Sequence, residues 1–317
     1  MKERPQLSIV LATDSDATIR PVVERLRAQT VNHLVELVLV CPAPESMPVV
    51  RECGGEFAST LTVRHPVNDL AGARAAGVLA ASAPLVFIGE THSFPHSDFA
   101  ALTIAAFRDP QWSVVVPALR NANPRGVLSW SGFLCDYGMW AEELPEGEIL
   151  TVPIYNATYR RSVLVELGER LPSALGQTDD LAIAMRERGR RAMFLPCSRV
   201  DHANTTQLWP WIANRFWGGL LIASNRSRGW SWTRRLVYVC GAFLLPAVLL
   251  PRILPGIRAR KGTWPRGTMP AVVISLILRA GGELLGYAGL FGRAAEDGML
   301  EIELHKLKYA VPRGPAR

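Results

Sequence analysis

Short, continuously apolar segments alternate with helix-like segments through the first two-thirds of this chain, and no other feature constrains its fold as strongly. The apolar runs have the length of buried strands, and the segments between them place apolar residues on one helix face. This order predicts an α/β fold with one mostly parallel sheet and helices on both of its faces. The expected strands span residues 7–12, 35–40, 61–63, 84–88, 112–117 and 192–195. The expected helices span residues 17–29, 69–81, 97–107, 161–167 and 179–188.

The composition limits the classes of partner. The chain has 317 residues, 49% of them hydrophobic, which is enough for a full core and too little for a transporter with many spans. Its net charge of +7 arises mainly in the C-terminal half. That charge favours anionic lipid or phosphate-bearing ligands over nucleic acid, because no nucleic-acid-binding motif accompanies it.

The cysteines and the N-terminus both bear on the cellular compartment. The five cysteines are scattered without a C-x-x-C pair, which argues against a zinc site or a disulfide framework and favours a reducing compartment. Residues 1–4 lead almost directly into the first expected strand, without the apolar segment of a signal peptide.

The strand expected at 84–88 is followed by Glu90, Thr91 and His92. In open α/β sheets, ligands bind where strands leave the sheet. Two residues separated by one position in extended backbone point to the same side, and a carboxylate with an imidazole can hold a divalent ion. The alternative is an ordinary polar connection from a strand to a loop.

Residues 121–153 form a long segment rich in Gly, Pro, Trp and acidic residues. The sequence predicts a loop here, and a loop of this length inside a compact domain is usually functional. Binding of an acceptor substrate is a natural use for it.

Five motifs resemble those of family 2 glycosyltransferases, nucleotide-sugar enzymes with the GT-A fold and its Rossmann-like sheet. The resemblance covers residues 7 to about 202 and follows the family's order along the chain. The matching segments are L-S-I-V-L-A followed by R-A-Q-T at 27–30, D-L-A-G-A-R-A-A-G at 69–77, E-T-H at 90–92, N-A-T-Y-R-R-S at 156–162, and T-D-D-L at 178–181 leading to Gly189.

The resemblance implies a metal site at Glu90 and His92, where the family carries D-x-D. His202, directly after the last expected strand, would be the third ligand, as in the D-x-H and distant His of polypeptide N-acetylgalactosaminyltransferases. Imidazole ligands favour Mn²⁺ over Mg²⁺. For His202 the alternative is a capped strand end.

The resemblance also implies residues for the donor and for catalysis. Arg74 would contact the diphosphate. The alternative is that Arg74 is an ordinary surface arginine. The base that activates the acceptor would be Asp180, or else Asp179, with inversion at the sugar carbon. The family's catalytic Asp could also align with Thr178. The alternative for Asp179 and Asp180 is a purely structural role, because the helix dipole favours acidic residues at a helix start. The nucleotide-binding residues implied by the resemblance are Ala12, Asp14, Arg74 and Glu90.

One family feature is missing after the second strand, where an Asp usually contacts the nucleobase. That place reads V-C-P-A-P at 40–44, with no carboxylate before Glu45. Asp14 or backbone groups would then take over the contact.

The C-terminal third differs in character. Tryptophans interleaved with arginines between residues 206 and 230 are typical of a membrane interface. The apolar stretches 236–251 and 270–278 are each shorter than the roughly 20 residues of a membrane span. The basic loop between them argues against two full crossings. We expect a hairpin in the cytoplasmic leaflet or interfacial helices, with a soluble helical subdomain or dimer interface as the alternative.

Together these features predict a glycosyltransferase domain at 1–205 and a membrane-associating helical region at 206–317. The enzyme would move a sugar from a UDP- or GDP-sugar donor to a lipid-linked or polysaccharide acceptor at the cytoplasmic face of the cell membrane, in cell-envelope synthesis, with Mn²⁺ or Mg²⁺. The alternative is a non-catalytic GT-A-like scaffold in a membrane assembly. A nucleotidyltransferase ranks third, because the Gly-rich phosphate loop and its Lys are missing after the first strand.

Overall fold

The computed structural model describes residues 3–53, 55–176, 178–260, 262–290 and 293–311, without the side chains of Thr178 and Asp179. The chain divides into two compact units. The sheet unit comprises Met1–Arg120 and Pro145–Asp201, and the helical unit comprises Asn121–Leu144 and His202–Arg317. The division into domains at residue 205 stays a prediction.

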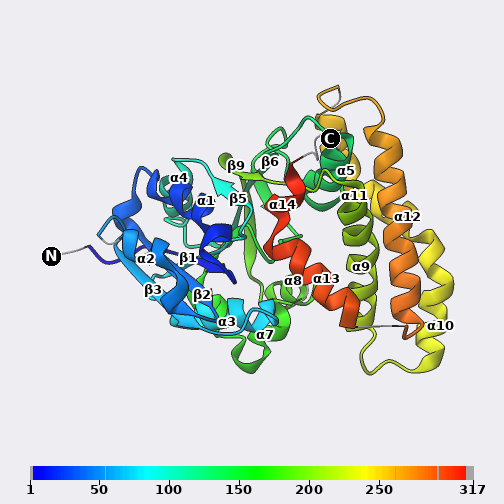
Figure 1. Ribbon diagram of the computed structural model, residues 1–317, viewed down its shortest axis with the longest axis horizontal. Helices are drawn as coiled ribbons and strands as arrows, with labels where there is room; N and C mark the ends of the chain where they lie inside the picture. The colour runs from blue at the N-terminus through cyan, green and yellow to red at the C-terminus, as the bar shows by residue number, and fades with distance from the viewer. Residues whose placement is uncertain (1–2, 54, 177, 261, 291–292, 312–317) are drawn as a thin grey trace. The chain divides into compact units, whose positions relative to one another are not determined.

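A nine-stranded sheet has the order β3-β2-β1-β4-β8-β6-β9-β5, with β7 paired to β9 (Figure 1). The first four strands of that order are parallel, as predicted, whereas β8 runs antiparallel to both β4 and β6, so the sheet is mixed. The strands are β1 (Leu7–Ala12), β2 (Val35–Cys41), β3 (Ser59–Arg64), β4 (Leu85–Ile88), β5 (Ser93–Pro95), β6 (Trp112–Asn121), β7 (Gly147–Ile149), β8 (Ala157–Arg160) and β9 (Arg191–His202).

Helices cover both faces of the parallel part, which explains why β1, β2 and β4 are buried at every position. On one face, α1 places Ile19 and Leu26 in a core with Ile9. On the other face, α3 approaches so closely that a Cβ on Gly77 would lie 2.4 Å from Val10 Cγ1. The helices of the sheet unit are α1 (Asp16–Arg27), α2 (Pro48–Glu52), α3 (Leu70–Ala80), α4 (Phe99–Ala106), α6 (Arg161–Val165), α7 (Leu171–Ala174) and α8 (Thr178–Glu187).

A buried carboxylate ties together the amino-terminal ends of the parallel strands. Glu36 on β2 is 3% exposed. It accepts hydrogen bonds from the hydroxyls of Ser8 on β1, Ser59 on β3 and Ser82, and from the backbone N–H of Ser82. Burial by itself would raise the pKa of Glu36, but the hydrogen bonds from Ser8, Ser82 and Ser59 outweigh it and hold that pKa below its usual value.

Two expectations were wrong. The segment 121–153 is not one loop, because it contains the eleven-residue helix α5 (Val127–Tyr137) and the short strand β7. The strand expected at 192–195 is much longer, since β9 continues through Pro196 to His202. Both differences concern the segments that lead from the sheet unit to the helical unit.

The helical unit is built around the pair α9 and α12, which Figure 1 shows as two long neighbouring helices. Glycine backbones form their contact. A Cβ on Gly282 would lie 2.0 Å from the carbonyl oxygen of Phe216, and one on Gly286 would lie 2.4 Å from that of Leu220. Small residues spaced four apart allow two helix backbones to approach this closely. The helices of this unit are α5, α9 (Leu208–Arg226), α10 (Trp232–Gly241), α11 (Leu245–Ala259), α12 (Thr268–Tyr287), α13 (Arg293–Leu304) and α14 (Lys306–Ala310).

Two helical segments of this unit are long and apolar enough to cross a membrane. Trp232–Ala259 has 28 residues and contains an 18-residue window with a mean hydropathy of 2.0, and Thr268–Tyr287 has 20 residues and contains such a window with a mean hydropathy of 1.5. Both segments are longer than the sequence predicts. Pro246 sits at the start of α11, where its missing N–H costs nothing, and α12 continues through Arg279 and Glu283, which form an ion pair with each other. Only 11% of the window in the first segment is buried, against 44% of the window in the second. A core helix of a soluble protein meets the same criteria of length and composition.

Candidate metal and donor site

Glu90 and His92 lie in the turn between β4 and β5, and their side chains converge. The Nε2 atom of His92 is 3.7 Å from Oε2 of Glu90, and both side chains are almost fully buried. The turn is closed by a hydrogen bond from the backbone N–H of Ser93 to the carbonyl of Glu90, 3.4 Å long. The two side chains therefore meet through a turn and not through the alternation of an extended strand.

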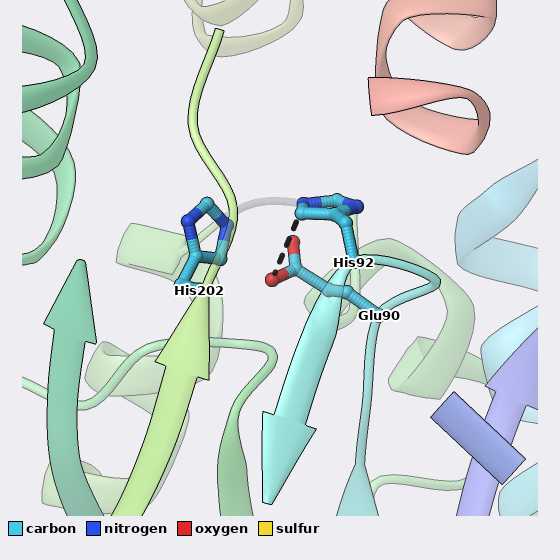
Figure 2. Close-up of side chains that lie close together, drawn as sticks. All are labelled: Glu90, His92 and His202. Carbon is cyan, nitrogen blue, oxygen red and sulfur yellow. Dashed lines mark ion pairs between the residues drawn. The ribbon is translucent and has the colours of Figure 1, made fainter. Parts of the chain in front are cut away.

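His202, the last residue of β9, completes a cluster of three possible metal ligands (Figure 2). One ligand atom from each of Glu90, His92 and His202 lies within 4.8 Å of the other two. His92 and His202 are at most 1% exposed. The residues predicted as ligands thus come together, although they are 110 positions apart along the chain.

Asn156 fixes the Glu90 carboxylate. Its side-chain amide donates to Glu90 Oε2 at 2.5 Å, and the hydroxyl of Ser93 donates to the same oxygen at 3.1 Å. Asn156 is fully buried and has a φ of 58°, in the left-handed region that Asn tolerates better than most residues. Its backbone N–H donates to Ile88 at the end of β4, so the same residue holds both the strand end and the carboxylate.

Asn204 fixes the ring of His202. The Nδ1 atom of His202 lies 3.0 Å from Oδ1 of Asn204. The amide nitrogen of Asn204 donates to Asn121 Oδ1, which identifies Oδ1 as the atom that faces the ring. Because an amide oxygen only accepts, Nδ1 must carry the proton, and in the neutral ring the lone pair then belongs to Nε2. The ring of Tyr137 packs against the ring of His202, with the two centroids 4.3 Å apart.

The donor set fits a divalent transition metal. One carboxylate and two imidazoles suit Mn²⁺ and its neighbours better than Mg²⁺, which prefers oxygen ligands and water. Each of Glu90 and His202 is oriented by an Asn, an arrangement that is typical of metal sites. The metal-ligand role of the three residues remains a prediction.

The residues expected to bind the nucleotide lie around the carboxyl ends of β1 and β4. Ala12 ends β1 next to Val40 of β2, and Asp14 follows two residues later. Arg74 on α3 is 8% exposed, and its guanidinium lies over the ring of Tyr155, 4.5 Å from the centroid. Tyr155 immediately precedes Asn156, so Arg74 packs beside the segment that holds Glu90.

The predicted catalytic carboxylates lie on the first turn of α8. Asp180 is exposed, and the side chain of Asp179 lies outside the described residues. In the described part of the chain, the ligand cluster consists of Glu90, His92 and His202, and neither Asp14 nor Asp180 belongs to it. The role of Asp180 as a base stays a prediction.

Sequence reasoning did not identify Asn156 and Asn204 as site residues. Asn156 was noted only as the first residue of a motif, and the positive φ of this position has no sequence signature other than Asn itself. Asn204 follows His202 by two residues, and this spacing was the one available signal.

No family model matches the sequence, and no curated protein matches it. Solved glycosyltransferase structures do match. The mannosyltransferase PcManGT from Pyrobaculum calidifontis, in complex with GDP-Man and Mn²⁺, is 16% identical with a TM-score of 0.54, and the match covers 96% of this chain and 88% of that one.

Two further structures match with TM-scores below 0.5. S. aureus TarS (1-349) in complex with UDP is 12% identical over 90% of this chain and 91% of that one, with a TM-score of 0.45. GalNAc-T7 with UDP, GalNAc and Mn²⁺ is 17% identical over 62% of this chain, with a TM-score of 0.49. The match spans 43% of the length of GalNAc-T7.

The likeness to PcManGT extends over nearly the whole chain. The sheet of this chain has the strand order β3-β2-β1-β4, followed by the antiparallel strand β8. The fold of this chain is therefore of the GT-A type.

Proposed function

We propose that this protein is a metal-dependent glycosyltransferase that moves a sugar from a UDP- or GDP-sugar to a hydroxyl acceptor. The observation that carries the proposal is the buried cluster of Glu90, His92 and His202 at strand ends of a GT-A fold. The likeness to a mannosyltransferase solved with GDP-Man and Mn²⁺ supports a nucleotide-sugar donor.

Glu90, His92 and His202 would hold Mn²⁺ or Mg²⁺, which when bound neutralises the charge that develops on a diphosphate leaving group. Asn156 and Asn204 would keep one carboxylate oxygen and one imidazole nitrogen of the ligands in a fixed orientation. Arg74 would add a positive charge for the diphosphate, with its guanidinium held flat on Tyr155.

In the proposed reaction the acceptor oxygen forms a bond to the anomeric carbon of the donor. The bond from that carbon to the diphosphate oxygen breaks, and the electron pair leaves with the nucleotide. Asp180, or else Asp179, takes the proton of the acceptor hydroxyl, so that a single displacement inverts the anomeric carbon.

We also propose that the helical unit binds the cytoplasmic face of the cell membrane, through a shallow hairpin or interfacial helices. Residues 202–282 contain eleven Lys and Arg and no Asp or Glu, which favours an anionic surface. Apolar side chains on α10 and in the turn after it are exposed, with Val237 at 67% and Phe243 at 74%. This location suits a lipid-linked or polysaccharide acceptor.

The metal and donor roles are tested by hydrolysis of UDP- and GDP-sugars with Mn²⁺, together with Mn²⁺ binding measured by calorimetry. Glu90→Ala and His92→Ala should each abolish hydrolysis and weaken Mn²⁺ binding. The matched control is His33→Ala, because His33 is 60% exposed and outside the cluster. Wild-type protein that binds a nucleotide sugar without turnover would instead support the non-catalytic scaffold, and hydrolysis unaffected by either alanine would refute the metal site.

Membrane binding is tested by flotation of the full chain with phosphatidylglycerol vesicles. The double substitution Phe243→Asp and Leu244→Asp should abolish flotation, because it places charge on an exposed apolar surface. Leu150→Asp is the control, since Leu150 is 81% exposed but belongs to the sheet unit. Equal flotation of the double variant and the control would refute this location.

A further inference from the structure

The helical unit contains a groove between the first turns of α9 and the α13–α14 segment. Its volume is about 730 Å³, within the range of small-molecule sites. Trp209, Trp217, Gln207, Glu301 and Tyr309 are among its lining residues. The groove therefore combines aromatic surface with several polar groups.

The groove is built by two close contacts. The backbone N–H of Thr206 donates to the carbonyl of Tyr309 at 2.8 Å, which fixes the C-terminal segment beside the start of α9. On α13, a Cβ on Gly298 would lie 2.2 Å from Trp217 Cζ3, so only glycine lets this helix pack against the indole. Trp217 is thereby held in place, whereas Trp209 at the rim is 70% exposed.

Gln207 is a polar lining residue of this groove. Its amide nitrogen donates to the carbonyls of Lys308 and Val311, at 3.0 and 3.3 Å, which fixes the orientation of the amide. The amide oxygen, Oε1, is buried and has no hydrogen-bond partner within the described residues. A buried acceptor without a partner is uncommon and indicates a group that something else satisfies.

A second polar group is Glu301. Its Oε1 accepts from Lys308 Nζ at 3.2 Å and from the hydroxyl of Tyr309 at 3.3 Å. A pyranose ring matches this combination, because it offers an apolar face to an indole and hydroxyl donors at its edge. A hydrocarbon tail would instead face the carboxylate of Glu301 without a polar group to offer it.

The groove is close to the proposed metal site along the chain. Thr206 lines it and follows His202 by four residues, so their Cα atoms are at most about 15 Å apart. We propose that this groove binds a carbohydrate portion of the acceptor, a proposal that rests on the proposed glycosyl transfer. It makes the acceptor a glycan or glycolipid and not a bare lipid alcohol.

The test is saturation-transfer NMR on the full chain with four free probes, the methyl pyranosides of glucose, mannose, galactose and N-acetylglucosamine. At least one should bind wild-type protein, and Trp209→Ala should weaken that binding about tenfold by removing the ring. Trp209→Phe should restore most of it. Circular dichroism verifies that both variants fold. Decanoate serves as the hydrocarbon probe.

The proposal is overturned if no pyranoside binds, if Trp209→Ala binds like wild type, or if decanoate alone occupies the groove. Donor hydrolysis by wild-type protein separates this result from the proposed function. Hydrolysis without pyranoside binding overturns only the proposal that the groove binds carbohydrate. Pyranoside binding that depends on Trp209, without hydrolysis, overturns the proposed glycosyl transfer and supports a carbohydrate site in the groove.

Discussion

Asn204 Oδ1 lies 3.0 Å from Nδ1 of His202, and this hydrogen bond determines which ring nitrogen keeps its lone pair. Asn204 is itself held by Asn121, whose Oδ1 accepts from the Asn204 amide at 3.1 Å. The orientation of the imidazole thus depends on a network of amides and not on His202 alone.

Asn204→Ala should weaken Mn²⁺ binding about 10- to 100-fold, because the ring of His202 loses its fixed tautomer and orientation. Calorimetry of Mn²⁺ binding measures the effect. Asn32→Ala is the matched control, since Asn32 is half-buried far along the chain from the cluster and bonds only its local backbone. Unchanged affinity in Asn204→Ala would show that the hydrogen bond has no part in metal binding.

Substitutions of Asn156 should separate the effect of its side-chain hydrogen bond from the effect of its backbone conformation. Asn156→Gly and Asn156→Ala both remove the donor to Glu90 and should both weaken Mn²⁺ binding. Only Asn156→Ala must also hold a Cβ at a φ of 58°, which should cost it a further 1 kcal/mol or so of stability relative to Asn156→Gly. Urea unfolding measures this difference in stability, and equal stability of the two variants would contradict a cost of the left-handed backbone at this position.

Glu36→Gln should lower the free energy of unfolding by about 1–3 kcal/mol at neutral pH, because the serine hydrogen bonds lose their charged acceptor. Folding lowers the pKa of Glu36, so its stabilisation is present above the unfolded value of about 4.3 and is lost as the pH falls through the folded value. The difference between wild type and variant should therefore shrink below about pH 4. A difference that stays constant down to about pH 3 would contradict this assignment.

Gly282→Ala should lower Tm by several degrees, since its Cβ would lie 2.0 Å from the backbone oxygen of Phe216 and only movement of α9 could relieve the contact. Gly281→Ala is the matched control on the same helix. Its Cβ would meet the Phe216 ring no closer than 3.7 Å, so the substitution should be neutral or slightly stabilising. Thermal unfolding of both variants provides the comparison, and equal Tm values would disprove the close packing of α9 on α12.

The sequence identified the elements that are buried over their whole length. β1, β2 and β4 are buried at every position and mostly apolar, so their short apolar runs sufficed to find them. β9 was predicted too short because Pro196 lacks an N–H and usually ends a strand. The cluster of Glu90, His92 and His202 was still predicted, because each residue lies at or just after the carboxyl end of a strand, β4 or β9.

The helix α5 could not be predicted from local signals. Its sequence V-L-S-W-S-G-F-L-C-D-Y contains two serines and a glycine, all poor helix formers. Packing stabilises it instead, because Trp130, Phe133 and Leu134 are buried in the helical unit. Asn156 and Asn204 could not be predicted as site residues for a similar reason. In the sequence, an asparagine that orients a metal ligand cannot be told from any other asparagine, because only the fold places it beside the ligand.

The discontinuous helical unit has a consequence for how the protein is made. α5 packs against α12, which begins about 130 residues after α5 ends. At about 5–20 residues per second, a ribosome delivers α12 roughly 7 to 26 seconds later. The helices α9 and α11 also contact α5 and are made earlier, but the side of α5 that packs against α12 stays uncovered during that interval. The nascent chain should therefore depend on a chaperone or an early encounter with lipid.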